Sequence, residues 1–358
     1  MAWPEPLEIS DIPDQAQGVI DLNIEDRRTN FPQESISFIL LALALIACLF
    51  SGIREATASD VETGSQAGHN FDLIHGTETE SRAGHGWFGL SYQYVSVDGF
   101  ESSVGKLPTG TVDSHSLYFE IEYYLNDKIS LRGGIPYFAK KHEGADIHNP
   151  LNLEPPRPYI ENVDDGTWNT GFEDIYLGIR YLAKDGPFVI EPFASFGVPS
   201  NQYPFFGAAA VGQRLWKFEL GTAFSWFPGL SNAYYRADVA YVFVEKTLGV
   251  NVNHWRLNAE VGYRFTPRLT GRAFMILKDG KGLSVPGDFT EDGVFVMTDE
   301  RWYQHDRLIK HNFMNVGIGL DWAVNKKYLL STNVMIQPWA DQVHAMEYAL
   351  TLGVSRSF

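Results

Sequence analysis

The segment MEYALTLGVSRSF, Met346–Phe358, alternates large apolar side chains with small or polar ones. One face carries Met346, Tyr348, Leu350, Leu352, Val354 and Phe358, and only Arg356 interrupts it. Because successive side chains of a β-strand point to opposite faces, this period of two predicts a strand with one apolar face. At about thirteen residues the segment exceeds most soluble strands and approaches the length of a tilted strand that crosses a bilayer.

The same alternation returns many times before this segment. Leu117, Phe119 and Ile121, for example, share a face opposite Glu120 and Glu122. We predict strands at roughly 86–97, 114–125, 128–138, 171–183, 187–198, 205–215, 216–227, 232–245, 254–265, 268–278, 312–324 and 327–358, where the last range holds two strands. Because outer-membrane barrels have an even number of strands, we expect about twelve and no more than about fourteen, the alternatives lying in residues 203–253.

Short and long connections alternate between these strands. Short turns are expected at 126–127, 184–186, 266–267 and 325–326, and long polar loops at 98–113, 139–167 and 279–311. Tight periplasmic turns on one side and long extracellular loops on the other are typical of outer-membrane barrels. The pattern predicts an all-β fold: a transmembrane antiparallel up-and-down β-barrel over residues 86–358, surrounded by the lipid of a bacterial outer membrane.

The composition agrees with a barrel and excludes a nucleic-acid-binding protein. Aromatic residues make up 14% of the 358 residues, glycine contributes 33, and the mean hydropathy is −0.17. Such values are expected when only alternate residues meet lipid. The formal net charge is −16, and no cluster of basic side chains in the sequence offers a surface for phosphates.

We interpret residues 1–58 as a leader. Phe38–Phe50 is an uncharged apolar run, too short to span a membrane as a helix but suited to the core of a signal peptide. Ala56-Thr57-Ala58 supplies a small-residue cleavage site, so we expect export and cleavage after Ala58. The long acidic segment before the core is unlike a basic n-region, and we therefore place the true start at a downstream non-Met codon.

Two features beside the signal core allow alternative interpretations. Leu45-Ile46-Ala47-Cys48 matches a lipoprotein cleavage box, but so short a box arises easily by chance in an Ala/Leu-rich run, and we favour the Ala58 site. Cys48 is the single cysteine, so no intramolecular disulfide is possible. Residues 59–85, rich in Gly, Ser, Thr and Glu, form either a polar linker or a plug of the pore.

Phe358 follows directly on the last predicted strand. We expect this strand to close the barrel against the strand at 86–97. A terminal phenylalanine on the lipid face resembles the C-terminal signal by which bacterial outer-membrane proteins are recognised for assembly. This resemblance implies the barrel-assembly machinery as a partner.

The predicted inner face carries charges of both signs. It holds Glu120, Glu122, Asp174, Glu191, Glu219, Asp238, Glu260 and Asp321 against Arg132, Arg180, Arg236, Arg256, Arg264 and Arg272. One interpretation is a lumen whose electric field selects solutes. The other, which we favour for any single residue, is a ladder of cross-strand ion pairs that fills a small barrel.

Neither a metal centre nor an enzyme site is indicated. The two longest predicted loops contain His142, His148, His305 and His311. They could ligate a metal such as Zn²⁺ together with nearby carboxylates if the two loops met. Their spacing matches no metal signature and no cysteine accompanies them, so we favour solvated loop residues and expect no cofactor. Ser114 and His115 are strand neighbours that point to opposite faces, so they cannot form a nucleophile–base pair, and no Gly-x-Ser-x-Gly elbow occurs.

The stretch GFEDIYLGIRY, Gly171–Tyr181, resembles a strand of the outer-membrane proteins named for the meta-pathway of phenol degradation, which are similar in style to the long-chain fatty-acid channel. The segments ISLRGGIPYF at 129–138 and NQYPFFGAAAVGQRL at 201–215 stand in the order expected around it. The resemblance covers about residues 90–358. It implies a channel for small hydrophobic or aromatic compounds.

Phe205 and Phe206 are the best candidates for lining such a hydrophobic path, together with Phe193, Phe274 and Ile276 on predicted inward faces. Apolar residues on an inward face break the alternation, and a conduit would explain them; a small packed core inside the lumen is the alternative. We expect passive passage of a small hydrophobic solute. The alternative function is a barrel with a blocked lumen that binds a partner through its acidic loops, and the sequence indicates no oligomeric state.

Overall fold

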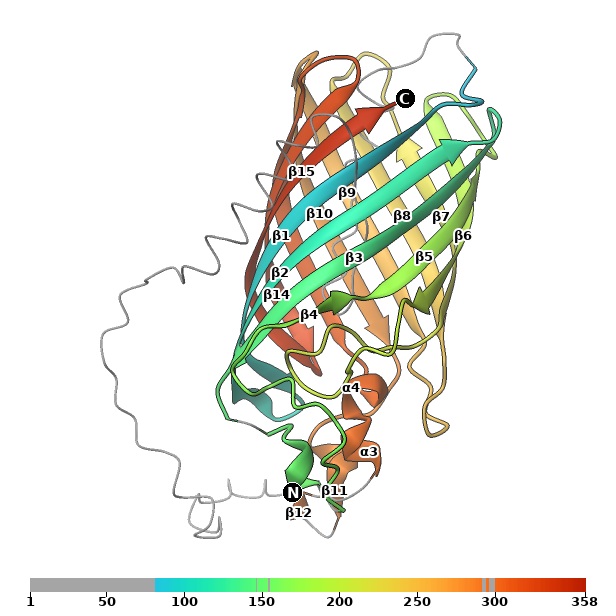
Figure 1. Cartoon of the computed structure of the whole chain (residues 1–358). Coiled ribbons are helices and arrows are strands. Elements are labelled where there is room, and N and C mark those ends of the chain that lie inside the picture. Colours follow the sequence, from blue (N-terminus) through green and yellow to red (C-terminus); the bar gives the residue numbers. More distant parts are fainter. Residues whose placement is uncertain (1–80, 146, 154, 292–293, 296–299) are drawn as a thin grey trace, which may run out of the picture. The chain divides into compact units, whose positions relative to one another are not determined.

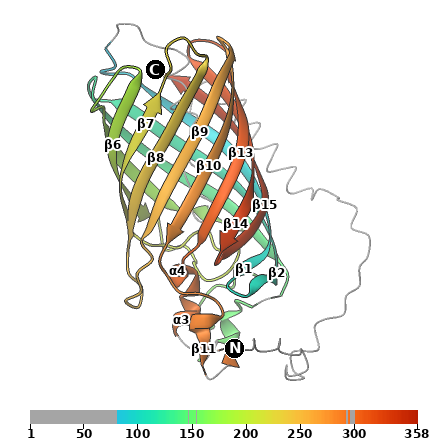
Figure 2. The same cartoon turned by 180° about the vertical axis from the view of Figure 1, so that it is seen from behind.

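The computed structural model describes residues 81–358, except 146, 154, 292–293 and 296–299. The described strands form one closed antiparallel barrel with strongly tilted strands (Figures 1 and 2). Most strands pair with their neighbours in the chain, and β1 pairs with both β2 and β15, so the sheet closes on itself. Among the residues described here, none of the helices has the length and apolar character that a membrane crossing requires.

Thirteen strands make up the sheet. They are β1 (Gly86–Ser102), β2 (Gly105–Tyr124), β3 (Ile129–Glu143), β4 (Asn169–Phe172), β5 (Asp174–Tyr181), β6 (Phe188–Pro199), β7 (Lys217–Trp226), β8 (Ala233–Val244), β9 (His254–Thr266), β10 (Leu269–Gly280), β13 (Asn312–Ala323), β14 (Tyr328–Asp341) and β15 (Val343–Ser357). The short β4 and β5 pair with successive parts of the same edge of β3, so together they occupy one strand position. The wall therefore has about twelve strand positions. The predicted all-β, up-and-down barrel is confirmed.

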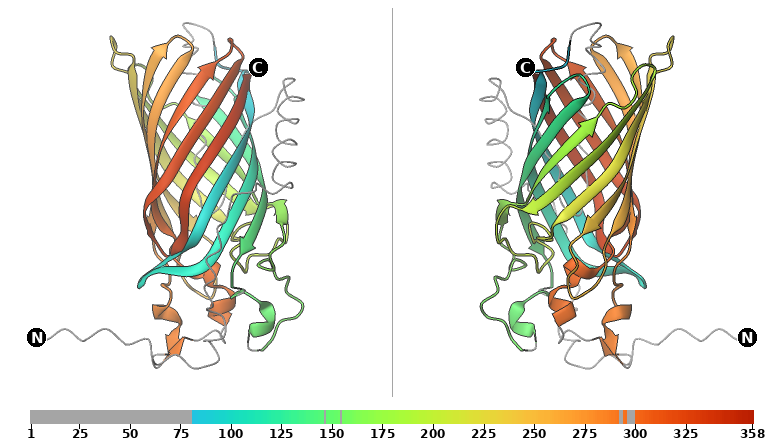
Figure 3. Two further views of the ribbon diagram at one scale, coloured as in Figure 1. Left: turned by 90° about the vertical axis from the view of Figure 1, so that its left-hand side faces the viewer. Right: turned by 90° about the vertical axis from the view of Figure 1, so that its right-hand side faces the viewer.

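All three long connections lie at one end of the barrel, and the described connections at the other end, 125–128, 182–187, 227–232, 267–268 and 324–327, are short. The long connections, 144–168, 200–216 and 281–311, carry the small elements β11 (Thr290–Glu291), β12 (Val294–Phe295), α3 (Glu300–Tyr303) and α4 (His305–Leu308). The C-terminus and the short turns lie at one end of the barrel, and the helices lie at the other end (Figure 3). We call the described residues of these three long connections the loop cap, and the asymmetry places it on the extracellular side.

Asparagine side chains shape two of the short turns. Asn126 Oδ1 accepts from the backbone N–H groups of Lys128 (2.8 Å) and Ile129 (3.0 Å), which turns β2 into β3. Asn325 makes the corresponding pair of bonds before β14. Such side-chain bonds stand in for backbone turn bonds, so two strands can be joined tightly at the membrane surface.

Large apolar side chains remain exposed around the outside of the wall. Leu177, Ile318 and Leu320 are 65%, 62% and 48% exposed, whereas the inward-facing Arg272 on the neighbouring strand β10 is buried. Trp226 at the end of β7 and Trp322 near the end of β13 are about half exposed, at 49% and 51%. An apolar surface with amphipathic rings near strand ends matches a bilayer and its headgroup level.

Residues 98–113, predicted to be a loop, belong to β1 and β2. The two strands stay paired from Gly86–Tyr123 as far as Ser102–Gly105, with one irregularity between Asp98 and Phe100. The polar composition was misleading because a hairpin that projects beyond the lipid needs paired backbone groups and no apolar face. The hairpin therefore extends the wall past the membrane on the loop-cap side.

Residues 205–215, predicted to be a strand, form the connection between β6 and β7 instead. The backbone N–H groups of Ala208 and Ala209 donate to the carboxylate of Asp164, at 2.9 and 2.8 Å, rather than to a neighbouring strand. The run of small residues also lacks the alternation of a wall strand. The sequence prediction included thirteen strands, one of them at 205–215, and without this segment twelve of them remain.

Met346 points inward, contrary to the apolar lipid face predicted for the last strand. A register shift in the β1–β15 ladder between Ser96 and Val97 pairs Val97 with Met346. Met346 is 4% exposed and packs in an inner apolar cluster with Val97 and Phe313. An alternation of side chains cannot reveal such a bulge, because the extra residue inverts the faces beyond it.

The barrel closes where the sequence predicted. Gly86 and Phe358 exchange two backbone hydrogen bonds, of 3.1 and 3.0 Å, and the Phe358 ring lies 5.5 Å from that of Phe88. The predicted leader 1–58 with its cleavage site, Cys48 and most of the segment 59–85 lie outside the described residues. Of that segment, Ser81 and Arg82 bind the side chain of Asp127.

Candidate functional site

A first group of charges on the inner face surrounds Arg132. Its guanidinium lies 2.6 Å from Glu120 and 3.5 Å from Glu122. Glu122 also accepts from Ser130 Oγ (2.6 Å) and Trp87 Nε1 (3.1 Å). Both carboxylates are almost fully buried, and buried charges are tolerated only when they are paired and hydrogen-bonded. This group therefore fills its part of the lumen.

A second group surrounds Arg272. Its Nε donates to Asp321 (2.9 Å), and a further guanidinium nitrogen lies 3.4 Å from Glu260. Arg272 also binds Asn333, and Glu260 accepts from Tyr234 (2.6 Å). The side chains of Arg272, Glu260 and Asp321 are at most 2% exposed. Side chains of five neighbouring strands, β8, β9, β10, β13 and β14, are thus tied together on the inner face of the wall.

The remaining predicted lumen residues take part in smaller contacts. Arg256 pairs with Glu219 and Asp238, Arg180 lies 3.6 Å from Glu191, Asp174 binds Tyr203 and lies 3.4 Å from Lys217, and Arg264 is half-buried. The two inward phenylalanines sit under guanidinium groups, Phe193 under Arg180 and Phe274 under Arg272, each 5.5 Å away. Cation–π contacts of this kind attach these rings to the charged network.

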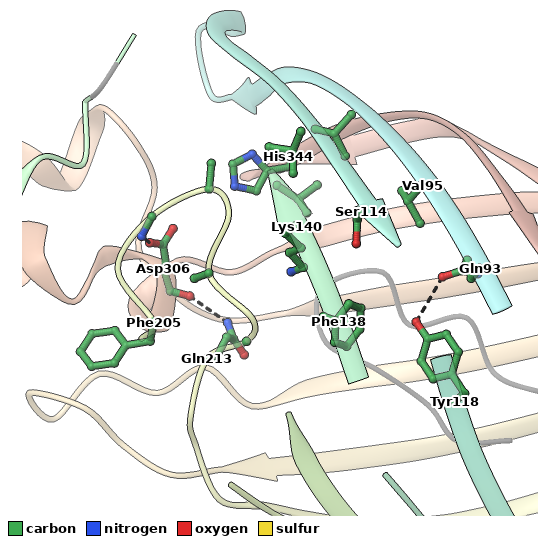
Figure 4. Close-up of a pocket in the computed structure, with 17 residues that line it drawn as sticks. Gln93, Val95, Ser114, Tyr118, Phe138, Lys140, Phe205, Gln213, Asp306 and His344 are labelled. Carbon is green, nitrogen blue, oxygen red and sulfur yellow. Dashed lines mark hydrogen bonds between the residues drawn. The ribbon is translucent and has the colours of Figure 1, made fainter. Parts of the chain in front are cut away.

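A pocket separates the loop cap from the wall (Figure 4). Its wall side consists of inward residues of β1, β2, β3 and β15, and its cap side of the connection 200–216 and α4. The lining includes Gln93, Val95, Val97, Val112, Ser114, Tyr118, Phe138, Lys140, Phe205, Gly207, Ala208, Ala210, Gly212, Gln213, Asp306, Val343 and His344, around a space that is partly open to solvent. Most of this lining is apolar, and its polar groups sit at separate points.

Several polar groups of the pocket are already oriented by neighbours. Tyr118 donates to Gln93 Oε1 (3.2 Å), and Gln213 Nε2 donates to the carbonyl oxygen of Asp306 (2.8 Å), as Figure 4 shows. An apolar cavity with a few fixed polar groups can hold a small ring compound that carries a hydroxyl. Ser114 lines this pocket, whereas His115 bonds to Tyr92 on the other face of β2, as predicted for strand neighbours.

Phe205 and Phe206 lie in the apolar core of the loop cap. They pack with Phe100, Leu153, Val285, Phe289, Trp302 and Ile309. Both are almost fully buried, at 4% and 2% exposure, and Phe205 also borders the pocket. The guanidinium groups of Arg214 and Arg307 lie 4.7 and 4.6 Å from the Phe205 ring. This core fixes the cap side of the pocket.

The loop histidines are buried, which corrects their interpretation as solvated residues. His142, His148, His305 and His311 are each at most 5% exposed. His148 Nδ1 lies 2.5 Å from Asp164 Oδ2, and its Nε2 lies 3.3 Å from Nε2 of His305. Residues 157 positions apart in sequence meet here, and the polar loop composition gave no sign of this cluster.

Asp164 is a buried anion at the centre of the loop cap. Burial alone would raise its pKa, but the hydrogen bond and charge of His148 and the N–H groups of Ala209 and Ala208 lower the pKa to about 2. Burial lowers the pKa of His305 well below its usual range. At neutral pH the cap thus holds an ionised Asp164 beside a neutral His305 imidazole.

The wall is incompletely paired beside the pocket. The ladder between β14 and β15 runs from Tyr328–Arg356 to Met335–Ala349. Beyond it, residues 336–341 pair with β13 and residues 343–348 pair with β1. Gln337 Oε1 accepts from the Met346 backbone N–H (3.0 Å) and bridges this stretch. The ladder between the two strands is therefore interrupted over the residues that precede and follow their junction at Gln342, where Val343 and His344 line the pocket.

Solved structures of other proteins resemble this chain in fold only. No protein-family model matches the chain, and no curated protein matches it. An outer-membrane channel from Pseudomonas putida F1 is similar in structure, with a TM-score of 0.56 at 13% identity, over 77% of this chain and 96% of that one. The CymD monoaromatic hydrocarbon channel (TM-score 0.41, 11% identity, 85% and 94% covered) and the NanC porin (0.42, 10%, 75% and 98%) are too distant to carry an argument. With its exposed apolar wall, the chain is an outer-membrane β-barrel.

Proposed function

We propose that this protein is a channel for the passive passage of small hydrophobic or aromatic compounds across the bacterial outer membrane. The observation that carries the proposal is the pocket between the loop cap and the wall. Its lining is mainly apolar, from Val, Ala and Phe side chains and glycine backbone, and its polar groups are Gln93, Ser114, Tyr118, Lys140, Gln213, Asp306 and His344. Such a lining favours an apolar ring over an ion or a sugar.

The charged groups below the pocket support passage of apolar solutes rather than ions. Arg132 pairs with Glu120 and Glu122, and Arg272 pairs with Glu260 and Asp321, in each case across adjacent strands and with buried carboxylates. An axial water-filled path would expose these side chains, as in the wide barrels of porins. We therefore expect little ionic conductance.

The interrupted ladder between β14 and β15 supports a lateral route. An apolar solute that reaches the pocket would pass between residues 336–341 and 343–348 toward lipid, where fewer backbone bonds have to open. Because apolar molecules partition into hydrocarbon, this route avoids the charged lumen. No covalent chemistry and no cofactor are part of this function.

Ala210→Trp tests the role of the pocket. Ala210 lines it from a connection outside the wall, so an indole there fills the space without altering a strand. We expect entry of a phenol- or toluene-like solute into liposomes with lipopolysaccharide outer leaflets to slow about tenfold or more. Val239→Trp, on the exposed face of β8 at 39% exposure, is the matched control and should leave the rate unchanged. Equal entry rates for the wild type, Ala210→Trp and Val239→Trp would show that the solute does not pass through the pocket.

The buried ion-pair groups also favour a second candidate, a barrel with a blocked lumen that binds a surface ligand through its loop cap. This candidate predicts no solute entry in the wild-type protein. The wild-type rate, compared with protein-free liposomes, therefore separates the two functions before any variant is made.

A further inference from the structure

We propose that the loop cap contains a zinc-binding site formed by His148, His305 and Asp306. One ligand atom from each residue lies within 4.8 Å of the others. His148 comes from the connection 144–168, and the other two come from α4 in the connection 281–311. The inference is independent of the channel function, because it concerns the cohesion of the cap and is tested by metal binding itself.

The hydrogen bonds on the far side of each ring direct both Nε2 atoms to the site. His305 Nδ1 lies 2.7 Å from the Trp302 carbonyl oxygen, which only accepts, so this nitrogen carries the hydrogen. His148 Nδ1 likewise donates to the Asp164 carboxylate, at 2.5 Å. With Nδ1 engaged on the far side of each ring, Nε2 is the atom that faces the site, and it can bind an ion once it carries no hydrogen. A carboxylate or carbonyl behind each histidine is the arrangement found around metal-bound imidazoles.

Three possible ligand atoms therefore converge at short distances. The two Nε2 atoms are 3.3 Å apart, and His305 Nε2 lies 3.2 Å from Asp306 Oδ1. Without an ion, a hydrogen between the two nitrogens accounts for the first distance, and a bound ion would displace that hydrogen. Two Zn–N bonds of about 2.05 Å at a tetrahedral angle separate the nitrogens by about 3.3 Å, and two in-plane imidazole centroids by about 5 Å.

The rings match this second distance as well. The centroids of His148 and His305 are 5.0 Å apart, with planes 10° from parallel. Trp302 stacks on His305 at 4.1 Å, and the edge of Phe206 meets both imidazoles. The ligand side chains are at most 13% exposed. Rings held by packing lose little freedom when an ion binds.

The second oxygen of Asp306 ties the site to the third connection. Asp306 Oδ2 accepts from the Gly207 N–H (3.1 Å), and Asp164 accepts from Ala208 and Ala209 in the same connection. An ion at this point would clamp all three long connections over the barrel. Two imidazoles and a carboxylate suit Zn²⁺, and a water molecule would complete a tetrahedral shell.

The test is a Zn²⁺ titration of the full-length barrel, refolded in detergent after chelator treatment. Calorimetry should show one Zn²⁺ per chain, and Co²⁺ should give the intense visible bands of a tetrahedral site. His148→Ala and His305→Ala should each weaken binding at least about 100-fold. Asp164→Asn, which leaves all three ligands in place, should weaken it about 10- to 100-fold.

His142→Ala is the matched control. His142 is equally buried but lies in β3, near the loop cap. Its Nε2 bonds to the Thr109 carbonyl oxygen, at 2.8 Å, and not to another histidine. It should bind Zn²⁺ like the wild type, and circular dichroism and heat-modifiable gel migration establish that every variant is folded. A wild-type chain that binds no Zn²⁺, or binding that survives both histidine substitutions, overturns the proposal.

Discussion

At the scale of single residues, Asp321 illustrates how the lumen is stabilised. Its carboxylate accepts from Arg272 Nε at 2.9 Å, and both side chains are almost inaccessible. Asp321→Asn keeps the shape of the side chain but removes the negative charge that balances the buried Arg272 guanidinium. We therefore expect a loss of about 2 to 4 kcal/mol in the free energy of unfolding.

Urea titration of the barrel in lipid vesicles measures this loss. Asp98→Asn is the control, because Asp98 pairs with Lys106 at 2.7 Å on the surface, where both side chains are nearly half exposed. Exposed pairs contribute little, so this variant should unfold within about 1 kcal/mol of the wild type. Equal losses in the two variants would mean that the lumen pair is solvated.

At the scale of elements, the outer face of β13 is the most direct test of the membrane assignment. Leu320→Arg places a charge on the exposed apolar wall and should cost about 2 to 4 kcal/mol in a bilayer. Leu230→Arg, the same substitution in the fully exposed turn between β7 and β8, should cost about 1 kcal/mol or less. Unfolding midpoints in vesicles measure both, and a harmless Leu320→Arg would contradict a lipid-facing strand.

The strands were also the part that the sequence predicted best. Alternation located every wall strand because lipid on one side and polar groups on the other impose a period of two, and closure of the last strand on the first followed from it. The prediction failed for residues 98–113 and 205–215. In the first, paired backbone continues beyond the lipid without an apolar face; in the second, a carboxylate from another connection takes the place of a strand partner.

The loop cap could not be predicted for a related reason. His148 and Asp164 are close in sequence, but His305 and Asp306 come from a connection far along the chain, and only the closed barrel brings them together. A polar, acidic loop composition predicts exposure. Here the cap has its own apolar core around Phe206 and Trp302, which buries His148 and His305.

At the scale of the whole molecule, the barrel combines a charged and filled lumen with a mainly apolar pocket under its cap and an interrupted β14–β15 ladder beside that pocket. A filled lumen hinders ions, while the pocket and the interrupted ladder support a route for apolar solutes. The two properties together distinguish the proposed channel from a general porin and from a blocked barrel.

The most direct test measures both properties on one sample. The refolded barrel is placed in planar bilayers for single-channel conductance and in lipopolysaccharide-bearing liposomes for entry of phenol- or toluene-like solutes. The account predicts solute entry well above that of protein-free liposomes, with little ionic conductance. Large, steady ionic conductance would make the protein a general porin, and silence in both assays would make it a blocked barrel; either result would contradict the proposed function.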